Sequence, residues 1–402
     1  MTPQEAYDRI IEHVRPLGVV RAMVGDSLGH CLAENVRADR DLPPADRSAM
    51  DGYAVRSADL VETPVSLRLA GEVAAGSPAR PKVAAGTCVR ILTGANVPPG
   101  ADAVAIVEST EDKGGQIVFR AAVELGENIL RKGEDTGKGA VVLRKGAVMG
   151  AAQVGLCAAI GKIACKVHRL PRVAVLSTGS ELRRAADSVG PHQMRDSNGP
   201  MIEAVLREWG LAGVSWNSVR DDLKLIAATL RRLLARNDVV ISTGGVSVGK
   251  HDLMAEAVAL ASAKIRVHGV AMKPGKPLLY AAATRNRHVF GLPGNPMAAM
   301  VGMHEFVLPA LSRLAGRATE ECRPAMAVVL ASPVRSKGDR QRMMPVCLQW
   351  LDGKPAAVPV ESRSSADLVA TAHADGCIVV PAGVREIVAG SCVEFRPWRR
   401  VR

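Results

Sequence analysis

An alternation of apolar runs and amphipathic segments between residues 172 and 316 constrains the fold of this chain more than any other feature. Apolar runs such as 173–177 and 239–242 are each followed by a stretch whose apolar residues recur at helical spacing. Strands that alternate with helices are typical of a mostly parallel sheet covered on both faces. We therefore predict a three-layer α/β domain in this part of the chain.

The segments on either side of this domain follow other patterns. Residues 43–138 and those after Arg323 contain short alternating runs and frequent Gly or Pro turns, which indicates a β-rich domain and then a small β-barrel or sandwich. Residues 140–166 are rich in Ala and Gly at helical spacing. With 402 residues, the chain is long enough for several cores.

The first helix has a clear start. Thr2 is a predicted N-cap, Pro3 occupies the first helical position and Glu5 completes a capping box. The helix then places apolar residues on one face, namely Ala6, Ile10, Ile11 and Val14.

Composition narrows the classes of partner. A net charge of +12 favours anionic partners, either nucleic acid, phosphorylated small molecules or oxyanions. Only 3% of the residues are aromatic and the basic residues are dispersed, so we expect no nucleic-acid partner. No apolar stretch is long enough to cross a bilayer, and we expect a cytoplasmic protein without a membrane partner. The eight cysteines include no Cys-x-x-Cys pair and are interpreted as reduced core thiols.

Two Ser-Thr-Gly turns follow buried strands of the predicted sheet, the first at Thr178 and the second at Gly244-Gly245, which continues to Ser247. Ligands bind at the carboxyl ends of strands in open α/β sheets. Paired glycines expose backbone N–H groups that form a cradle for an anion. The second turn lacks the Gly-Lys-Ser/Thr ending of a Walker motif, so it predicts a phosphate or carboxylate site of another kind.

Three carboxylates, Glu181, Asp221 and Asp252, follow these strands near the starts of helices. Each could be a capping residue and no more. If they gather beside an anion cradle, they are better explained as Mg²⁺ ligands, because a cation would relieve their repulsion of a polyphosphate.

Two loops rich in proline present further candidates. Lys273 and Lys276 flank a Pro-Gly pair that fixes the loop, which suits an oxyanion such as molybdate or a phosphate; an ordinary basic turn is the alternative. Pro293 and Pro296 bracket a Gly-Asn turn that is either part of the same site or a structural corner.

The β-rich region contains three clusters in which a polar group stands beside a glycine in a turn context, as in a site carried by loops. The candidate residues in these clusters are Asp51, Thr93, Arg131 and Asp135.

The order of these motifs resembles that of the MoeA family, the molybdopterin molybdenumtransferases, which also includes domains of gephyrin and plant Cnx. The motifs are Ser-Ala-Met-Asp-Gly-Tyr-Ala, Thr-Gly-Ala, Arg-Lys-Gly-Glu-Asp, Ser-Thr-Gly-Ser-Glu, Asp196-Ser-Asn198, Ser-Thr-Gly-Gly-Val-Ser-Val-Gly, Lys-Pro-Gly-Lys-Pro and Leu-Pro-Gly-Asn-Pro. The resemblance spans essentially the whole chain.

The resemblance implies an α/β multidomain fold in four parts. These are a split helical segment (1–42 and 139–168), a β-rich domain (43–138), a central three-layer molybdopterin-binding α/β domain (169–318) and a C-terminal β-barrel (319–402). It also implies an elongated homodimer whose active cleft lies between the α/β domain of one subunit and the β-rich domain of the other.

The resemblance assigns roles to the candidates. Asp51, Thr93 and Asp135 would lie on one wall of the cleft, and Glu181, Asp221 and Asp252 on the other, with Mg²⁺ held by Asp221 and Asp252. Gly244, Gly245 and Ser247 would hold the terminal phosphate of the pterin. Lys273 with Arg340 or Arg342 and Ser364 or Ser365 would form the molybdate pocket. Further substrate contacts are expected from Arg131, Thr178, Lys276, Pro293 and Pro296.

The resemblance thus implies an enzyme that inserts molybdate into adenylylated molybdopterin and releases AMP, in contact with other proteins of molybdenum-cofactor assembly and with acceptor enzymes. One alternative is the preceding adenylylation of molybdopterin, which a related α/β domain performs. A second is a scaffold without catalysis, as in gephyrin.

Overall fold

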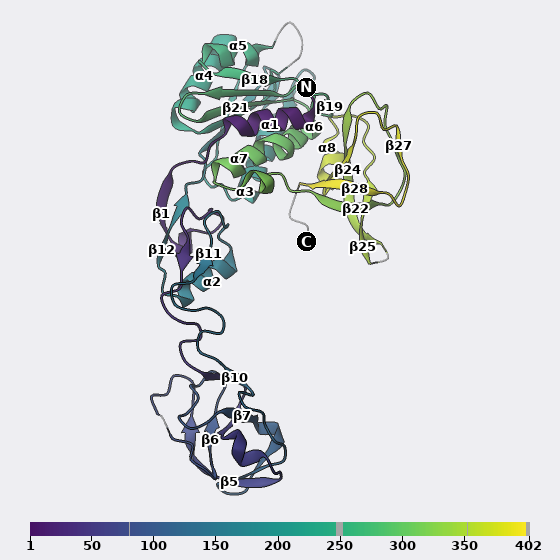
Figure 1. Cartoon of the computed structure of the whole chain (residues 1–402). Helices are drawn as coiled ribbons and strands as arrows, with labels where there is room; N and C mark the ends of the chain where they lie inside the picture. The colour runs from purple at the N-terminus through teal and green to yellow at the C-terminus, as the bar shows by residue number, and fades with distance from the viewer. Residues whose placement is uncertain (80, 247–251, 352, 399–402) are drawn as a thin grey trace. The chain divides into compact units, whose positions relative to one another are not determined.

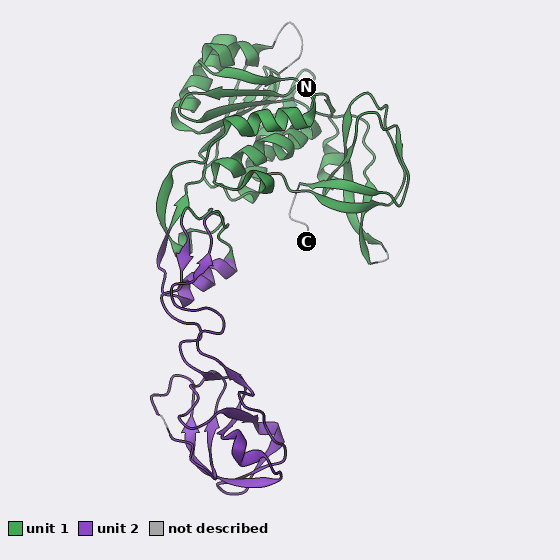
Figure 2. Ribbon diagram, viewed as in Figure 1, with its two compact units in different colours: residues 1–33, 146–150, 166–402 green, residues 34–145, 151–165 purple. Residues whose placement is uncertain are grey.

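The computed structural model describes residues 1–79, 81–246, 252–351 and 353–398 (Figure 1). The chain forms two compact units (Figure 2). Unit 1 comprises residues 1–33, 146–150 and 166–402, and unit 2 comprises residues 34–145 and 151–165. No helix in the described parts of the chain has both the length and the apolar character needed to cross a membrane.

Unit 1 begins with helix α1 (Pro3–His13), which confirms the predicted start. The Thr2 hydroxyl accepts a hydrogen bond from the Glu5 N–H, and the Glu5 carboxylate accepts one from the Thr2 N–H. The predicted apolar face, Ala6, Ile10, Ile11 and Val14, is buried. The capping box therefore fixes where the helix starts, and the apolar face fixes which side packs on the core.

The centre of unit 1 is a six-stranded sheet, and its strand order shows why three turns meet at one edge. The order is β16 (Ser215–Val219), β13 (Val173–Thr178), β17 (Val239–Thr243), β21 (Arg287–Leu292), β20 (Leu279–Ala283) and β18 (Lys264–His268). The first four strands are parallel, whereas β20 and β18 run antiparallel to their neighbours. The carboxyl ends of β13, β17 and β21 therefore lie side by side.

Helices cover both faces of this sheet. Figure 1 shows α1, α3 (Asn198–Glu208) and α7 (Leu308–Leu314) on one side, and α4 (Leu223–Arg236) and α5 (Leu253–Leu260) on the other. Successive side chains of strand β13 point alternately into the two hydrophobic cores. Val173 and Val175 belong to the first core, and Ala174 and Leu176 to the second. This three-layer arrangement confirms the predicted α/β domain.

The C-terminal part of unit 1 is a closed five-stranded barrel. Its strands are β24 (Gln341–Leu351), β25 (Lys354–Pro359), β22 (Met326–Leu330), β28 (Cys392–Pro397) and β26 (Gly376–Val380), and pairing of β26 with β24 closes it. The short strand β19 (Met272–Lys273) adds to the barrel in parallel with β24. Of the two architectures that the sequence left open, barrel or sandwich, the barrel is formed.

Unit 2 is mostly β-structure. Its main sheet has the order β7 (Ala103–Ile106), β4 (Gly52–Val55), β6 (Thr87–Ile91), β5 (Val65–Val73), β9 (Gln116–Phe119) and β8 (Thr110–Asp112). Two short pairs accompany it: β3 (Arg47–Ser48) with β10 (Ile129–Leu130), and β2 (Val36–Arg37) with β11 (Val141–Leu143). The β-rich character that the sequence indicated is confirmed.

The helix expected within residues 140–166 is shorter than its composition suggested. Only α2 (Ala151–Ala159) is helical. The residues before and after it form strands, β11 and β12 (Ala164–His168), and β12 pairs with β1 (Val19–Met23). Val141, Val142 and Val167 are β-branched, and their preference for extended backbone prevails over the spacing of the alanines.

Candidate functional site

A cavity of about 550 Å³ lies where the turns after β13, β17 and β21 meet. Parallel register aligns these strand ends, because Ser177 pairs with Thr243 and Thr243 with Leu292. We call this cavity the glycine pocket, and its walls include Thr178, Glu181, Asp221, Gly244, Gly245 and Gly294. Five residues predicted for the site from the sequence are thus brought together at one edge of the sheet.

The second turn brings backbone to the floor of the glycine pocket. Gly244 and Gly245 have φ angles of 84° and 65°, in the left-handed region that favours glycine. A Cβ added to Gly244 would lie 2.2 Å from the Thr178 carbonyl oxygen, too close for any other residue. Thr178 Oγ1 is buried beside these glycines and has no hydrogen-bond partner among the described residues. A buried hydroxyl without a partner is unfavourable, so this group suits a bound ligand.

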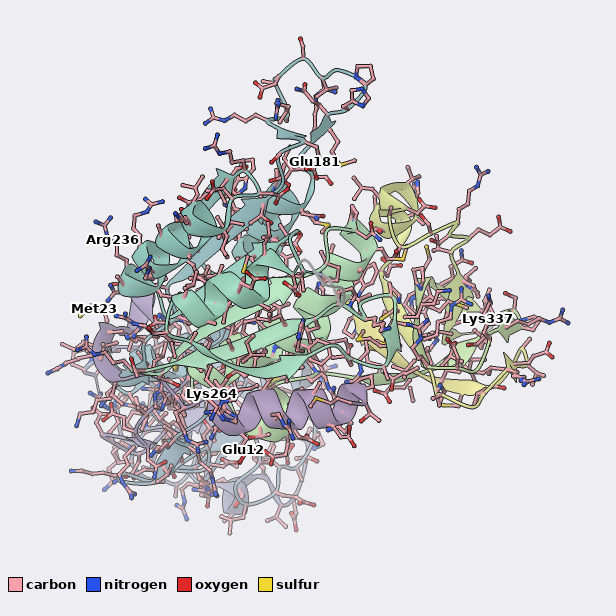
Figure 3. All side chains as sticks on the ribbon, turned by 90° about the horizontal axis from the view of Figure 1, so that it is seen from above. Glu12, Met23, Glu181, Arg236, Lys264 and Lys337 are labelled. Atoms are coloured by element: carbon pink, nitrogen blue, oxygen red, sulfur yellow. The ribbon has the colours of Figure 1, made fainter. Side chains whose placement is uncertain are left out.

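The two carboxylates of the glycine pocket are exposed. Asp221 Oδ2 accepts a hydrogen bond of 3.1 Å from the Ser180 N–H, and the Asp221 N–H donates one of 3.1 Å to Ser180 Oγ. Asp222, its neighbour, is the N-cap of α4. Asp221 is therefore not needed to cap that helix. Glu181 also lines the glycine pocket. In Figure 3 it lies on the side of the view opposite to Glu12 of helix α1.

Asp252 has a different environment. It is the N-cap of α5, and its Oδ1 accepts a hydrogen bond of 2.9 Å from the Ala255 N–H. Its Oδ2 lies 3.0 Å from His268 Nε2, and the residue is only 7% exposed. Asp252 is not among the residues that line the glycine pocket. The capping role that the sequence allowed is confirmed, whereas the metal role stays a prediction.

Asn198 joins two of the turns and was not singled out as a site residue from the sequence. Its Nδ2 donates to Thr243 Oγ1 at 2.8 Å and to the Gly294 carbonyl oxygen at 2.7 Å. These bonds fix the third turn against the second. The one sequence signal for this role is the position of Asn198 in the Asp196-Ser-Asn198 motif.

The third turn connects the glycine pocket to the barrel. Pro296 occupies the first turn of α6 (Pro296–Gly302), and the Pro293 carbonyl oxygen accepts a hydrogen bond from Thr243 Oγ1. Asn295 Nδ2 donates to Ser365 Oγ at 2.7 Å, and the Met297 N–H donates to the Ser365 carbonyl oxygen. The predicted residue Ser365 therefore lies at this turn, although 70 residues separate it from Asn295.

Among the predicted oxyanion residues, Arg340 is paired with Asp339, outside the glycine pocket. Arg340 Nε lies 3.1 Å from Asp339 Oδ2. The hydrogen bond from Arg340, with a smaller contribution from the charge of Lys273, lowers the pKa of Asp339. Lys273 in β19 is exposed and pairs in register with Arg342 of β24. Lys276 is exposed, and its carbonyl oxygen accepts hydrogen bonds from Val270 and Leu278.

Unit 2 holds the remaining candidates. Asp51 Oδ1 accepts hydrogen bonds of 2.7 Å from both the N–H and the hydroxyl of Thr93, and these bonds lower the Asp51 pKa. Arg131 is paired with Asp46 at 2.9 Å. Asp135 is exposed, and its N–H donates to the Leu42 carbonyl oxygen. Thus Asp51 and Thr93 form a unit, and no described hydrogen bond or ion pair links them to Arg131 or Asp135.

One predicted phosphate contact, Ser247, lies outside the described residues. Within the described ranges, no cluster of three or more His, Cys, Asp or Glu side chains is arranged to hold a metal ion.

Family models match almost the whole chain. Residues 1–161 match the MoeA N-terminal region (domain I and II), residues 174–313 match a probable molybdopterin binding domain, and residues 327–398 match the MoeA C-terminal region (domain IV).

Curated relatives and solved structures agree with these matches. A molybdopterin molybdenumtransferase of Staphylococcus aureus is 33% identical over 396 residues, which cover 98% of this chain and 94% of the relative. One from Staphylococcus epidermidis is 32% identical, with 97% and 94% covered. A crystal structure of a molybdopterin biosynthesis MoeA protein from Pyrococcus horikoshii is 30% identical, covers 100% of both chains and superposes with a TM-score of 0.77.

Proposed function

This chain belongs to the MoeA family, and from that premise we propose that it is a molybdopterin molybdenumtransferase. In the proposed reaction, molybdate is inserted into adenylylated molybdopterin and AMP is released. The observation that carries the proposal is the glycine pocket itself, where two left-handed glycines, a buried Thr178 hydroxyl and two exposed carboxylates share one sheet edge.

The glycine pocket suits a phosphate-bearing substrate. The turn at Gly244-Gly245 allows backbone to approach a phosphate closely, and Thr178 Oγ1 supplies a donor. Asp221 and Glu181 would repel the same phosphates. We therefore propose that Mg²⁺ accompanies the substrate, with Asp221 as a protein ligand and phosphate oxygens completing the shell. The ion would neutralise charge that develops as the phosphoanhydride is cleaved.

The basic residues beside the barrel suit molybdate. Arg340 is paired with Asp339, Lys273 pairs in register with Arg342, and Ser365 lies at the third turn, which also forms part of the glycine pocket through Gly294. We propose that Lys273 and Lys276 hold the oxyanion while the dithiolene sulfurs of the pterin take up the metal. The protein would then act by positioning and charge neutralisation, without a covalent nucleophile.

The direct test supplies purified protein with adenylylated molybdopterin, molybdate and Mg²⁺ and follows AMP. AMP release should require molybdate, and Asp221→Asn should reduce it about a hundredfold. Glu256→Gln, which removes an exposed carboxylate in the first turn of α5, serves as the matched control. If the protein instead forms pyrophosphate from molybdopterin and Mg·ATP, it is the adenylyltransferase.

We also propose a homodimer in which Asp51 and Thr93 of one protomer serve the glycine pocket of the other. The proposal rests on the resemblance of the sequence motifs, and complementation tests it. Asp51→Asn and Asp221→Asn homodimers should both be nearly inactive. A mixed dimer of the two variants should recover one intact site of two. No recovery on mixing, or a monomer in light scattering, contradicts the shared site.

This proposed role places the enzyme in the cytoplasm with other proteins of cofactor assembly and with acceptor enzymes as its transient partners. Two separate binding measurements test this proposal. We expect the protein to bind those partner proteins and not to bind nucleic acid at physiological salt.

A further inference from the structure

A second cavity, of about 500 Å³, lies at the other end of the central sheet from the glycine pocket. We call it the basic hollow, and it is defined by His13, Arg15, Lys264, Arg266, Asn286 and His288. It includes the start of β21, whereas the glycine pocket follows the end of that strand. Six residues of strand span roughly 17 Å, so the two cavities are distinct.

The charged residues that line the basic hollow are all basic. Arg15, Lys264 and Arg266 line it, and no Asp or Glu is among its described lining residues. None of these three side chains takes part in the ion pairs or side-chain hydrogen bonds that the structure describes, and Arg266 Nε is buried without a hydrogen-bond partner. Cations gathered without counter-charge repel one another, and an anion would relieve that repulsion.

The backbone conformation of strand β18 determines where the Arg266 side chain lies. Strand β18 is an edge strand, and its register against β20 shifts between Ile265 and Val267. Arg266 is the extra residue at this irregularity. Such bulges leave one residue unpaired and re-aim its side chain, and they are frequent beside binding sites. The position of the guanidinium in the basic hollow is thus a consequence of a specific backbone feature.

The walls of the basic hollow are held firmly. Asn286 accepts a hydrogen bond from the Arg15 N–H and donates one to the Arg15 carbonyl oxygen, which ties the β20–β21 turn to the end of α1. His288 is buried, and burial lowers its pKa to about 4, so the ring is neutral at pH 7. Asp238, which also influences that ring, is bonded to Arg169 at 2.6 and 2.7 Å. The charge of Asp238 is therefore already compensated.

We propose that the basic hollow is an anion site that binds a tetrahedral oxyanion, either free or as the phosphate group of a small molecule. Arg15, Lys264 and Arg266 would supply charge, and Thr284 and Ser262 would supply neutral hydrogen-bonding groups. Its volume is within the range of small-ligand pockets, so an organic body on the phosphate has room. This inference does not depend on the proposed transferase activity.

Calorimetric titration of the full chain tests the inference. Lys273→Gln combined with Gly244→Ala is used as the background, so that neither the expected molybdate residue nor the glycine pocket contributes to anion binding. Inorganic phosphate should bind this protein at one site per chain, and Arg266→Gln should weaken that binding roughly tenfold. Arg236→Gln, which removes an exposed cation from α4, is the matched control and should change affinity less than twofold.

The comparison of ligands distinguishes the sources of the oxyanion. Tighter binding of AMP than of phosphate assigns the site to a phosphorylated small molecule, and equal binding assigns it to a free oxyanion. Equal losses in Arg266→Gln and Arg236→Gln, or no phosphate bound in the background protein, would overturn the proposal. If Arg266→Gln unfolds, Lys264→Gln at an exposed position replaces it, with the same expectation.

Discussion

The glycine pocket and the buried ionic cluster around Glu305 use charge in opposite ways. In the pocket, Asp221 and Glu181 are exposed to solvent. Glu305 is 2% exposed and lies in the π-helical segment η4 (Met303–Val307). Its Oε2 lies 3.8 Å from Arg323 Nη1, and its Oε1 lies 3.8 Å from Arg396 Nε.

This difference separates carboxylates that can act in a reaction from a carboxylate that stabilises the fold. An exposed carboxylate keeps its hydration, and a cation or substrate can reach it. A buried carboxylate must be compensated by the protein, and here its partners come from the start of the barrel region and from β28. The Glu305 cluster thus links the α/β domain to the barrel, whereas the pocket carboxylates contribute little to folding.

The largest expected effect is on stability. Glu305→Ala should lower the free energy of unfolding by about 3 kcal/mol, because the buried Arg323 guanidinium loses its counter-ion and Arg396 keeps only Glu394. Urea denaturation measures this loss. Glu203→Ala removes one partner of the exposed Glu203–Arg207 pair on α3 and should cost about 0.5 kcal/mol or less. Similar costs for the two variants would show that the comparison between buried and exposed charge is wrong.

The next effect is on activity. Gly244→Ala should reduce AMP release at least a hundredfold, equivalent to about 2.7 kcal/mol, because the new Cβ would meet the Thr178 carbonyl oxygen. The assay proposed above measures this rate. Gly29→Ala, at another left-handed glycine with no atom near the added Cβ, controls for backbone strain alone. Retained turnover in Gly244→Ala would remove the turn from the site.

A third, smaller effect depends on pH. Burial alone would raise the pKa of Asp238, but hydrogen bonds from Arg169 and the Arg172 N–H lower it below the ordinary value of 3.8. As the pH falls, the Asp238 carboxylate is therefore protonated at a higher pH in the unfolded chain than in the folded protein. The stabilisation is present above pH 4 and is lost as pH falls through the lowered pKa. Asp238→Asn should cost about 2 kcal/mol at neutral pH and remove that acid dependence.

Chemical denaturation at a series of pH values follows this prediction for wild type and variant. Parallel curves for the two proteins below pH 4 would contradict it.

The smallest effect on stability separates the two roles of Asp252. Serine also caps helices but has no second oxygen for His268, so Asp252→Ser should lower the free energy of unfolding by about 1 kcal/mol. Because we expect the carboxylate to act in the reaction, AMP release should nevertheless fall while pterin binding persists. Thermal unfolding and turnover are measured on the same preparation. Full turnover in this variant would limit Asp252 to the capping role.

Local features of the fold could be predicted from the sequence. The Thr2 cap, the buried face of α1 and the Ser-Thr-Gly turns each depend on residues close in the chain. Because parallel strands end at one edge, the meeting of Thr178 with Gly244 also followed from pattern alone.

Contacts between distant segments could not be predicted in this way. The Asn295–Ser365 bond, the Asp252–His268 contact and the bulge at Arg266 depend on strand register and loop paths. A residue at such a position resembles any other polar residue in the sequence. Glu305 is the clearest case, since nothing in its neighbourhood along the chain indicates the arginines from residues 323 and 396.

Strand β19 gives the lysine loop a mechanical role. Its backbone is hydrogen-bonded to β24 of the barrel, while Val270 and Leu278 on either side of the loop bond to the carbonyl oxygen of Lys276. The loop is thus closed by its own backbone hydrogen bonds and joined to the barrel through β19. A displacement of the barrel would move the Lys273 backbone with it, so these sheet hydrogen bonds would couple the position of the barrel to that of the proposed molybdate ligand.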